Sequence, residues 1–113
     1  MTTIAFFRTP EGILLGFDSR GHTGFAEAGE DIVCAAVSAL TQATLNGLLN
    51  VLKAPANFEL DEEGAHLAVT LAENFPEDKL EGAQLLLNTL ISGLQSVEAA
   101  YPRFVRVTFK EWR

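Results

Sequence analysis

The feature that most constrains the fold is a pair of long stretches, residues 31–53 and 79–101, whose apolar residues recur at helical spacing. Such spacing places the apolar side chains on one face and predicts two amphipathic helices. Pro55 and Pro102 mark where the two helices stop. Asn46-Gly47 is a weak helix-forming pair inside the first. The predicted apolar faces are Val33, Val37, Leu40, Thr44, Leu48 and Val51 in the first helix, and Ala83, Leu87, Leu90, Leu94 and Val97 in the second.

The remaining ordered segments have the composition of β-strands separated by turn signals. Pro-Glu-Gly at residues 10–12 and Asp-Glu-Glu-Gly at 61–64 each connect two such segments, which predicts two hairpins. Alternation predicts that Ile13, Leu15 and Phe17 share one face. The strands are predicted at residues 2–9, 13–19, 57–60, 65–71 and 103–109.

In the fourth strand, Ala65, Leu67, Val69 and Leu71 are predicted to share a face. His66 lies on the other side with Ala68 and Thr70 and is predicted to be exposed, with no role.

The resulting order is β-β-α-β-β-α-β. It predicts an α+β fold of two layers, with a mostly antiparallel five-stranded sheet and two long helices on one face. At 113 residues, the chain is predicted to be a single domain over residues 1–113.

Charge and cysteine usage limit the partners and the compartment. The formal net charge of −7 disfavours nucleic acid, whose phosphates would be repelled, and makes a basic peptide or protein a plausible partner. Acidity alone is also explained by solubility. A single cysteine cannot form an internal disulfide, which indicates a reducing compartment. No signal peptide and no apolar run of the roughly 20 residues needed to span a membrane is recognised, so a soluble, cytoplasmic protein is predicted.

The chemistry concentrates in residues 21–38, GHTGFAEAGEDIVCAAVS. If the first helix begins near Asp31, Cys34 lies in its first turn, where the helix dipole favours a thiolate. Asp31 and Ser38 project from the same side of the helix as Cys34. His22 approaches from the preceding loop, and a thiolate beside an imidazole is the usual construction of a cysteine nucleophile.

Residues 20–30 are glycine-rich and follow neither period, which predicts a loop, and loops of this length are often functional. Gly21, Gly24 and Gly29 would let it approach the helix closely or move as a lid.

The residues alone leave a second interpretation open. A lone cysteine among alanines in a helix is more often a small buried side chain than a nucleophile. Asp31 is more often only a helix cap, and Ser38 can simply bond a carbonyl one turn back. One cysteine and two separated histidines do not make a ligand set, so no metal site is predicted.

The stretch closely resembles the signature of the ribosomal-processing cysteine protease family, Prp. That signature is Gly-His, a short glycine-containing loop, Asp-Ile-Val-Cys-Ala, and a serine four residues after the cysteine. The matching residues here are Gly21-His22, Gly29, Asp31-Ile32-Val33-Cys34-Ala35 and Ser38.

The resemblance implies an endopeptidase that needs no cofactor and acts as a homodimer with a mobile loop over its site. Its implied substrate is the N-terminal extension of the twenty-seventh protein of the large ribosomal subunit, cleaved after Phe-Phe and before Ala. By position, Cys34 matches the nucleophile and His22 the general base and acid. Asp31 and Ser38 match further motif positions, where Asp31 either orients His22 or only caps the helix.

Two alternatives remain at this point. The small fold and the clusters of acidic residues at 27–31, 59–64 and 73–81 also fit a non-enzymatic binding module for ribosome assembly, with Cys34 and His22 dispensable. A redox-sensing thiol at Cys34 is the third hypothesis.

Overall fold

The computed structural model describes residues 1–22 and 31–112 and contains the predicted elements in the predicted order. Short turns of π-helix (η1) and 3₁₀-helix (η2) are added next to the two long helices. In chain order the elements are β1 (Thr2–Arg8), β2 (Leu14–Arg20), α1 (Ile32–Asn46), η1 (Gly47–Val51), β3 (Ala56–Asp61), β4 (His66–Leu71), η2 (Glu77–Lys79), α2 (Leu80–Ala100) and β5 (Val105–Glu111).

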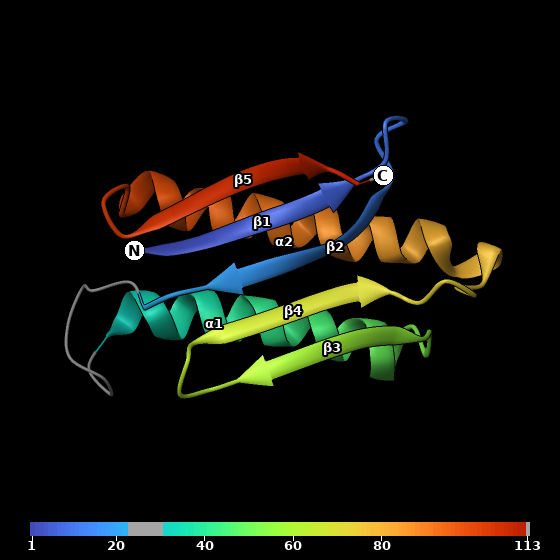
Figure 1. The fold of residues 1–113 in the computed structure, drawn as a ribbon, viewed down its shortest axis with the longest axis horizontal. Coiled ribbons are helices and arrows are strands. Elements are labelled where there is room, and N and C mark those ends of the chain that lie inside the picture. Colours follow the sequence, from blue (N-terminus) through green and yellow to red (C-terminus); the bar gives the residue numbers. More distant parts are fainter. Residues whose placement is uncertain (23–30, 113) are drawn as a thin grey trace.

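The strands form one sheet in the order β3-β4-β2-β1-β5, and both long helices cover the same face of it (Figure 1). The predicted two-layer α+β fold is confirmed. Three of the strand pairs are antiparallel, whereas β1 and β5 are parallel, so the sheet is mixed. The parallel pair arises because the 21 residues of α2 carry the chain back along the sheet before β5 begins.

The core lies between the sheet and the two helices. Phe6 of β1 and Phe17 of β2 are fully buried, with ring centroids 5.9 Å apart. Leu87 and Leu94 of α2 close over this layer, also with no exposed surface. Burying several large apolar side chains of this kind is what holds the helices against the sheet.

The weak pair Asn46-Gly47 does change the first helix. The α-helix ends at Asn46 and continues as a π-turn from Gly47 to Val51. Because a π-turn accommodates an extra residue, it rotates the positions that follow it. Val51, predicted on the apolar face, is 81% exposed, and that assignment was wrong.

The prediction that Ile13, Leu15 and Phe17 share one face of the second strand was wrong at its start, although Phe17 is fully buried. Phe7 pairs with Gly16 and Arg8 with Leu14, so Leu15 is skipped and forms a bulge that reverses the alternation. Leu14 is therefore buried, while Ile13 is exposed. The side chain of Gln84 on α2 bonds both the N–H and the C=O of Leu14, at 2.7 and 2.8 Å, and holds this point against the helix.

In β4, Leu67 and Val69 are buried as predicted. Ala65 precedes the strand in a left-handed turn with φ of 49°. His66 was predicted to be exposed but is half-buried, because its Nε2 lies 3.1 Å from Oδ1 of Asp18 on the neighbouring strand.

By length and composition alone, the segment Ile32–Val51 would suffice to cross a membrane, which the sequence reading did not recognise. The core helix of a water-soluble protein meets the same criterion. Val33, Val37 and Leu48 of this segment are buried in the core formed with the sheet and α2, which accounts for its apolar character.

Candidate active site

A pocket of about 260 Å³ lies between α1 and the adjoining ends of β2, β3 and β4. Three predicted site residues line it: His22, Cys34 and Ser38. Its floor includes Ser19 and Leu67 of the sheet. The fold therefore brings together the two residues that the sequence predicted as a pair.

Cys34 occupies the first turn of α1 and is half-buried. The helix starts there because Asp31 caps it: with φ of −79° and ψ of 96°, Asp31 is extended, and its Oδ1 accepts a hydrogen bond of 2.8 Å from the N–H of Cys34. The other N–H groups of this turn and the helix dipole favour negative charge near Cys34. The N–H of Cys34 itself is occupied by Asp31, so it is not available here as an oxyanion donor.

His22 is exposed and follows a firmly held residue, Gly21. The N–H of Gly21 donates to the carbonyl of Ala65 at 3.0 Å, and its carbonyl accepts from the hydroxyl of Thr2 at 2.8 Å. Gly21 has φ of 94°, a conformation that favours glycine, and a Cβ there would lie 2.6 Å from the carbonyl oxygen of Met1. Glycine is thus required at position 21 for its backbone conformation, and the hydrogen bonds of Gly21 fix the position of the backbone from which His22 follows.

Ser38 lies one turn beyond Cys34, half-buried at the same pocket. Its carbonyl accepts a 3.2 Å bond from the hydroxyl of Thr41, which also donates to Val37 at 2.9 Å. The hydroxyl of Thr41 is therefore satisfied by the backbone of α1. Ser38, for which the sequence predicted a supporting role, lines the cavity.

Gly24 and Gly29, predicted as part of a mobile loop, lie outside the described residues. The lid prediction therefore stays a prediction.

The sequence reading missed the contribution of the β3–β4 hairpin. Leu60, Glu62 and His66 also line the pocket, and they lie 26 to 32 positions after Cys34 in the chain. Nothing local to these residues signals a site. A reading that placed β4 beside β2, so that the hairpin met the end of the loop after β2, could have found them.

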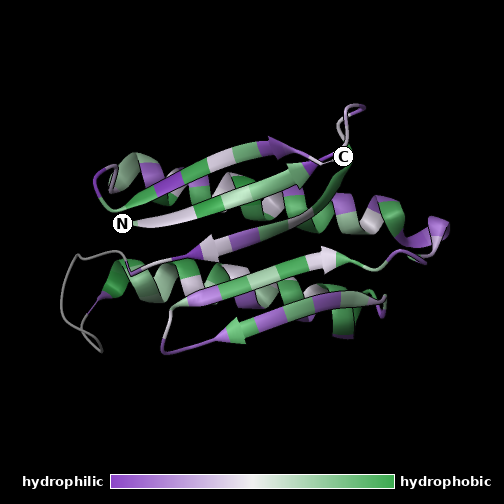
Figure 2. Ribbon diagram, in the orientation of Figure 1, coloured by the Kyte–Doolittle hydropathy of each residue, from purple (hydrophilic) through white to green (hydrophobic). Residues whose placement is uncertain are grey.

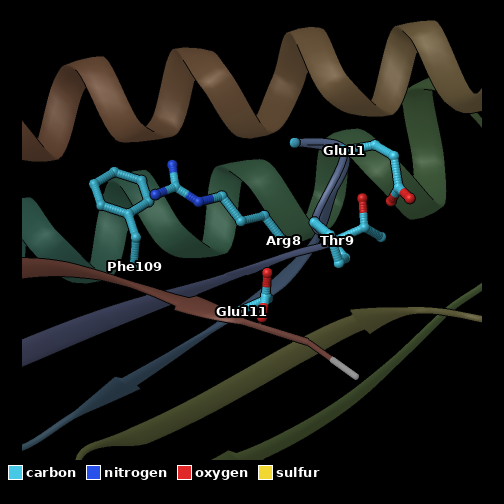
Figure 3. A pocket seen from close by; sticks show the side chains of 7 residues that line it. Arg8, Thr9, Glu11, Phe109 and Glu111 are labelled. Atoms are coloured by element: carbon cyan, nitrogen blue, oxygen red, sulfur yellow. The ribbon is translucent and has the colours of Figure 1, made fainter.

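A second pocket, of about 380 Å³, lies at the opposite end of the sheet, between the β1–β2 turn and the end of β5 (Figure 3). There the guanidinium carbon of Arg8 lies 4.7 Å from the centroid of the Phe109 ring, with Glu11 and Glu111 nearby. This arrangement stabilises the end of the sheet through a cation–π contact. It contains none of the predicted nucleophilic residues.

Comparison with known proteins decides the family. A family model described as "Cysteine protease Prp" matches residues 1–106. The chain belongs to the Prp family of cysteine proteases. The resemblance read from residues 21–38 is thereby confirmed. The chain is accordingly a cysteine protease, which favours the enzymatic hypothesis over the binding module and the redox sensor.

Two proteins named as Prp match this chain over most of their length. The ribosomal processing cysteine protease Prp of Bacillus subtilis is 30% identical over 95 residues, covering 84% of this chain and 85% of the relative. The Staphylococcus aureus protein of the same name is 27% identical over 110 residues, covering 97% and 100%.

The fold comparison agrees. The crystal structure of the essential S. aureus ribosomal processing protease Prp, with a covalently linked product peptide, matches with a TM-score of 0.86 at 28% identity, covering 97% of this chain and all of that one. A Streptococcus mutans protein, SMU.848, matches with a TM-score of 0.84 at 30% identity, covering 99% and 96%.

Proposed function

We propose that this Prp protein is a ribosomal processing endopeptidase in which Cys34 is the nucleophile and His22 the general base and acid. The observation that carries this proposal is that Cys34 and His22 line one pocket. Cys34 is also the single cysteine of the chain, so a cysteine protease of this sequence has no other thiol to use.

The reaction follows from the two side chains. His22 takes the proton of the Cys34 thiol, and the thiolate attacks the scissile carbonyl carbon to give a tetrahedral intermediate. Its collapse breaks the C–N bond as His22 returns the proton to the leaving amine, which leaves a thioester on Cys34. His22 then deprotonates a water that hydrolyses the thioester and restores the thiol. No cofactor or metal is needed for these steps.

Asp31 and Ser38 are assigned supporting roles. The bond from the N–H of Cys34 to Asp31 supports a cap that fixes the backbone of the nucleophile. Orientation of His22 is the alternative role for Asp31. Ser38 faces the pocket one turn after Cys34, where its hydroxyl can contact a bound peptide.

For the substrate, we infer the N-terminal extension of the twenty-seventh protein of the large ribosomal subunit, cleaved after Phe-Phe and before Ala. The names of the B. subtilis and S. aureus relatives support ribosomal processing, and the S. aureus structures carry a substrate or product peptide. We further propose that the protein works in the cytoplasm as a homodimer.

The test uses a fluorogenic peptide that spans a Phe-Phe-Ala junction. Cys34→Ala and His22→Ala should each lower kcat/KM by about 10³-fold or more, because each removes a group that takes part in bond making. Ser96→Ala, an exposed substitution on α2, is the matched control and should cleave as wild type does. Equal cleavage by wild type and Cys34→Ala would refute the proposal.

A further inference from the structure

The edge strand β3 carries two large apolar side chains that the core does not use. β3 is the terminal strand of the sheet within the described part of the chain. Phe58 is 51% exposed and Leu60 is 47% exposed. Exposed apolar residues on a sheet edge invite association with another chain, so their presence calls for an occupant.

The register shows which way these two side chains point. Phe58 pairs with Val69 and Leu60 with Leu67, and directly paired residues share a face of the sheet. Val69 and Leu67 are buried beneath the helices, so Phe58 and Leu60 lie on the helix side. Figure 2 shows apolar and polar segments alternating along β3.

This apolar surface is continuous with the candidate active site, because Leu60 lines the same pocket as Cys34 and His22. Phe58 is the next residue on that face of β3, leading away from the pocket. Residues two apart on a strand are separated by about 7 Å, which is also the spacing of alternate side chains in an extended peptide.

We propose that Phe58 and Leu60 form the docking surface for the substrate peptide, which lies extended along the helix side of β3 and places apolar side chains of alternate residues against them. Leu60 contacts the side chain nearer the scissile bond, and Phe58 the one two residues further from it. This inference rests on the proposed function, since it identifies what the protease site recognises.

Charge favours a peptide over a second copy of this chain. Glu59 and Asp61 occupy the opposite face of β3, and Glu62 and Glu63 follow in the turn. Pairing two β3 strands would bring these carboxylates together, and like charges facing each other across strands are destabilising. A peptide with apolar residues beside basic ones can contact the apolar side chains of β3 and is attracted by the carboxylates of β3 and the following turn.

The test measures binding without cleavage. In the Cys34→Ala protein, a labelled peptide spanning the Phe-Phe-Ala junction is titrated by fluorescence anisotropy. Adding Leu60→Thr or Phe58→Thr should raise Kd by about 10-fold each, from loss of apolar contact, while threonine preserves the strand. Leu85→Gln on α2 is the matched control, because Leu85 is 70% exposed and lies outside the pocket, and it should leave Kd unchanged.

A second arm tests the alternate spacing. The upstream residues of the peptide are replaced by alanine one at a time, and each peptide is titrated against Leu60→Thr and its parent. At one peptide position, alanine should raise Kd for the parent protein but not for Leu60→Thr. At the position two residues further upstream, alanine should raise Kd for the parent but not for Phe58→Thr.

The outcomes separate this inference from the proposed function. Cleavage by wild type with unchanged Kd in both β3 variants refutes the docking surface and leaves the protease assignment standing. If binding depends on Leu60 but wild type does not cleave the peptide, the docking surface stands and the protease assignment is refuted. Absence of peptide binding overturns the docking surface. It is also overturned if sedimentation shows that the β3 variants turn a dimer into a monomer while Kd is unchanged, because a second copy is then the occupant.

Discussion

At the scale of single residues, Asp31 connects the start of α1 to Cys34, the proposed nucleophile. Its carboxylate accepts the N–H of Cys34, so the same bond that caps α1 also fixes the backbone from which the thiol projects. This contact of Asp31 is therefore with the backbone of Cys34 and not with its thiol.

Substitutions at Asp31 should separate the cap from a catalytic role. Asp31→Ala removes the acceptor and should lower the free energy of unfolding by about 1 kcal/mol, measured by urea denaturation. Asp31→Asn keeps an oxygen acceptor and should retain most of that stability. If Asp31 is only a cap, Asp31→Asn also keeps kcat near wild type. A fall of 100-fold or more (roughly the scale of a lost orienting group) with unchanged stability would show instead that Asp31 orients His22.

The sequence predicted some residues of the candidate site and missed others, for a physical reason. His22, Asp31, Cys34 and Ser38 all lie within residues 22–38, so one short stretch of the sequence contains them all. Leu60 reaches the pocket only because β3 pairs with β4 and β4 with β2. Such long-range pairing is set by the whole fold and leaves no local pattern.

At the scale of elements, two glycines differ in how much room the neighbouring element leaves for a side chain. A Cβ at Gly16 in β2 would overlap the carbonyl oxygen of Val69 and lie 2.8 Å from the Cα of Thr70. Both are backbone atoms of the paired strand β4, which cannot withdraw without opening the sheet. At Gly93 in α2, the nearest atom is a methyl group of Leu40 at 3.4 Å, an ordinary contact.

Alanine at the two positions should therefore have opposite effects. Gly16→Ala should destabilise the protein by about 2 kcal/mol or more, because two strands must separate. Gly93→Ala should stabilise it by roughly 0.5–1 kcal/mol, because alanine is the better helix former. Thermal and urea unfolding of both variants would measure this. A stability loss in Gly93→Ala similar to that in Gly16→Ala would contradict the packing argument.

The positions of the elements were predicted well because the periodicity of their apolar residues is strong. The predicted side-chain faces were wrong where the backbone departs from that period. Each strand and the second helix begin and end within two residues of the expected range, and the first helix does so once its π-turn η1 is counted with α1. The bulge at Leu15 and the π-turn after Asn46 each insert one residue, which reverses or rotates the side chains beyond them. Neither has a sequence signal as strong as the period that it interrupts, although Asn46-Gly47 did indicate a weak point.

At the scale of the whole molecule, charge and shape act together at one end. The protein has a formal net charge of −7, and Glu62 lines the pocket that contains Cys34 and His22. The hairpin that supplies Leu60 also carries Glu59, Asp61 and Glu63. The acidic residues of the hairpin thus attract a basic peptide beside the apolar contacts, and this attraction affects the rate of encounter more than the final affinity.

This arrangement predicts that kcat/KM depends on salt concentration only when the substrate peptide is positively charged. For a Phe-Phe-Ala peptide followed by lysines, kcat/KM should fall by roughly fivefold as NaCl rises from about 0.02 to 0.5 M, because the Debye length shortens severalfold over that range. A matched peptide with glutamines in place of the lysines should show little change, since salt then acts only on apolar contact. Glu62→Gln should flatten the response to the basic peptide in part, because most of the attraction comes from the summed field of many carboxylates. Equal salt responses for the two peptides would show that binding depends on apolar contact alone and that the acidic surface serves solubility.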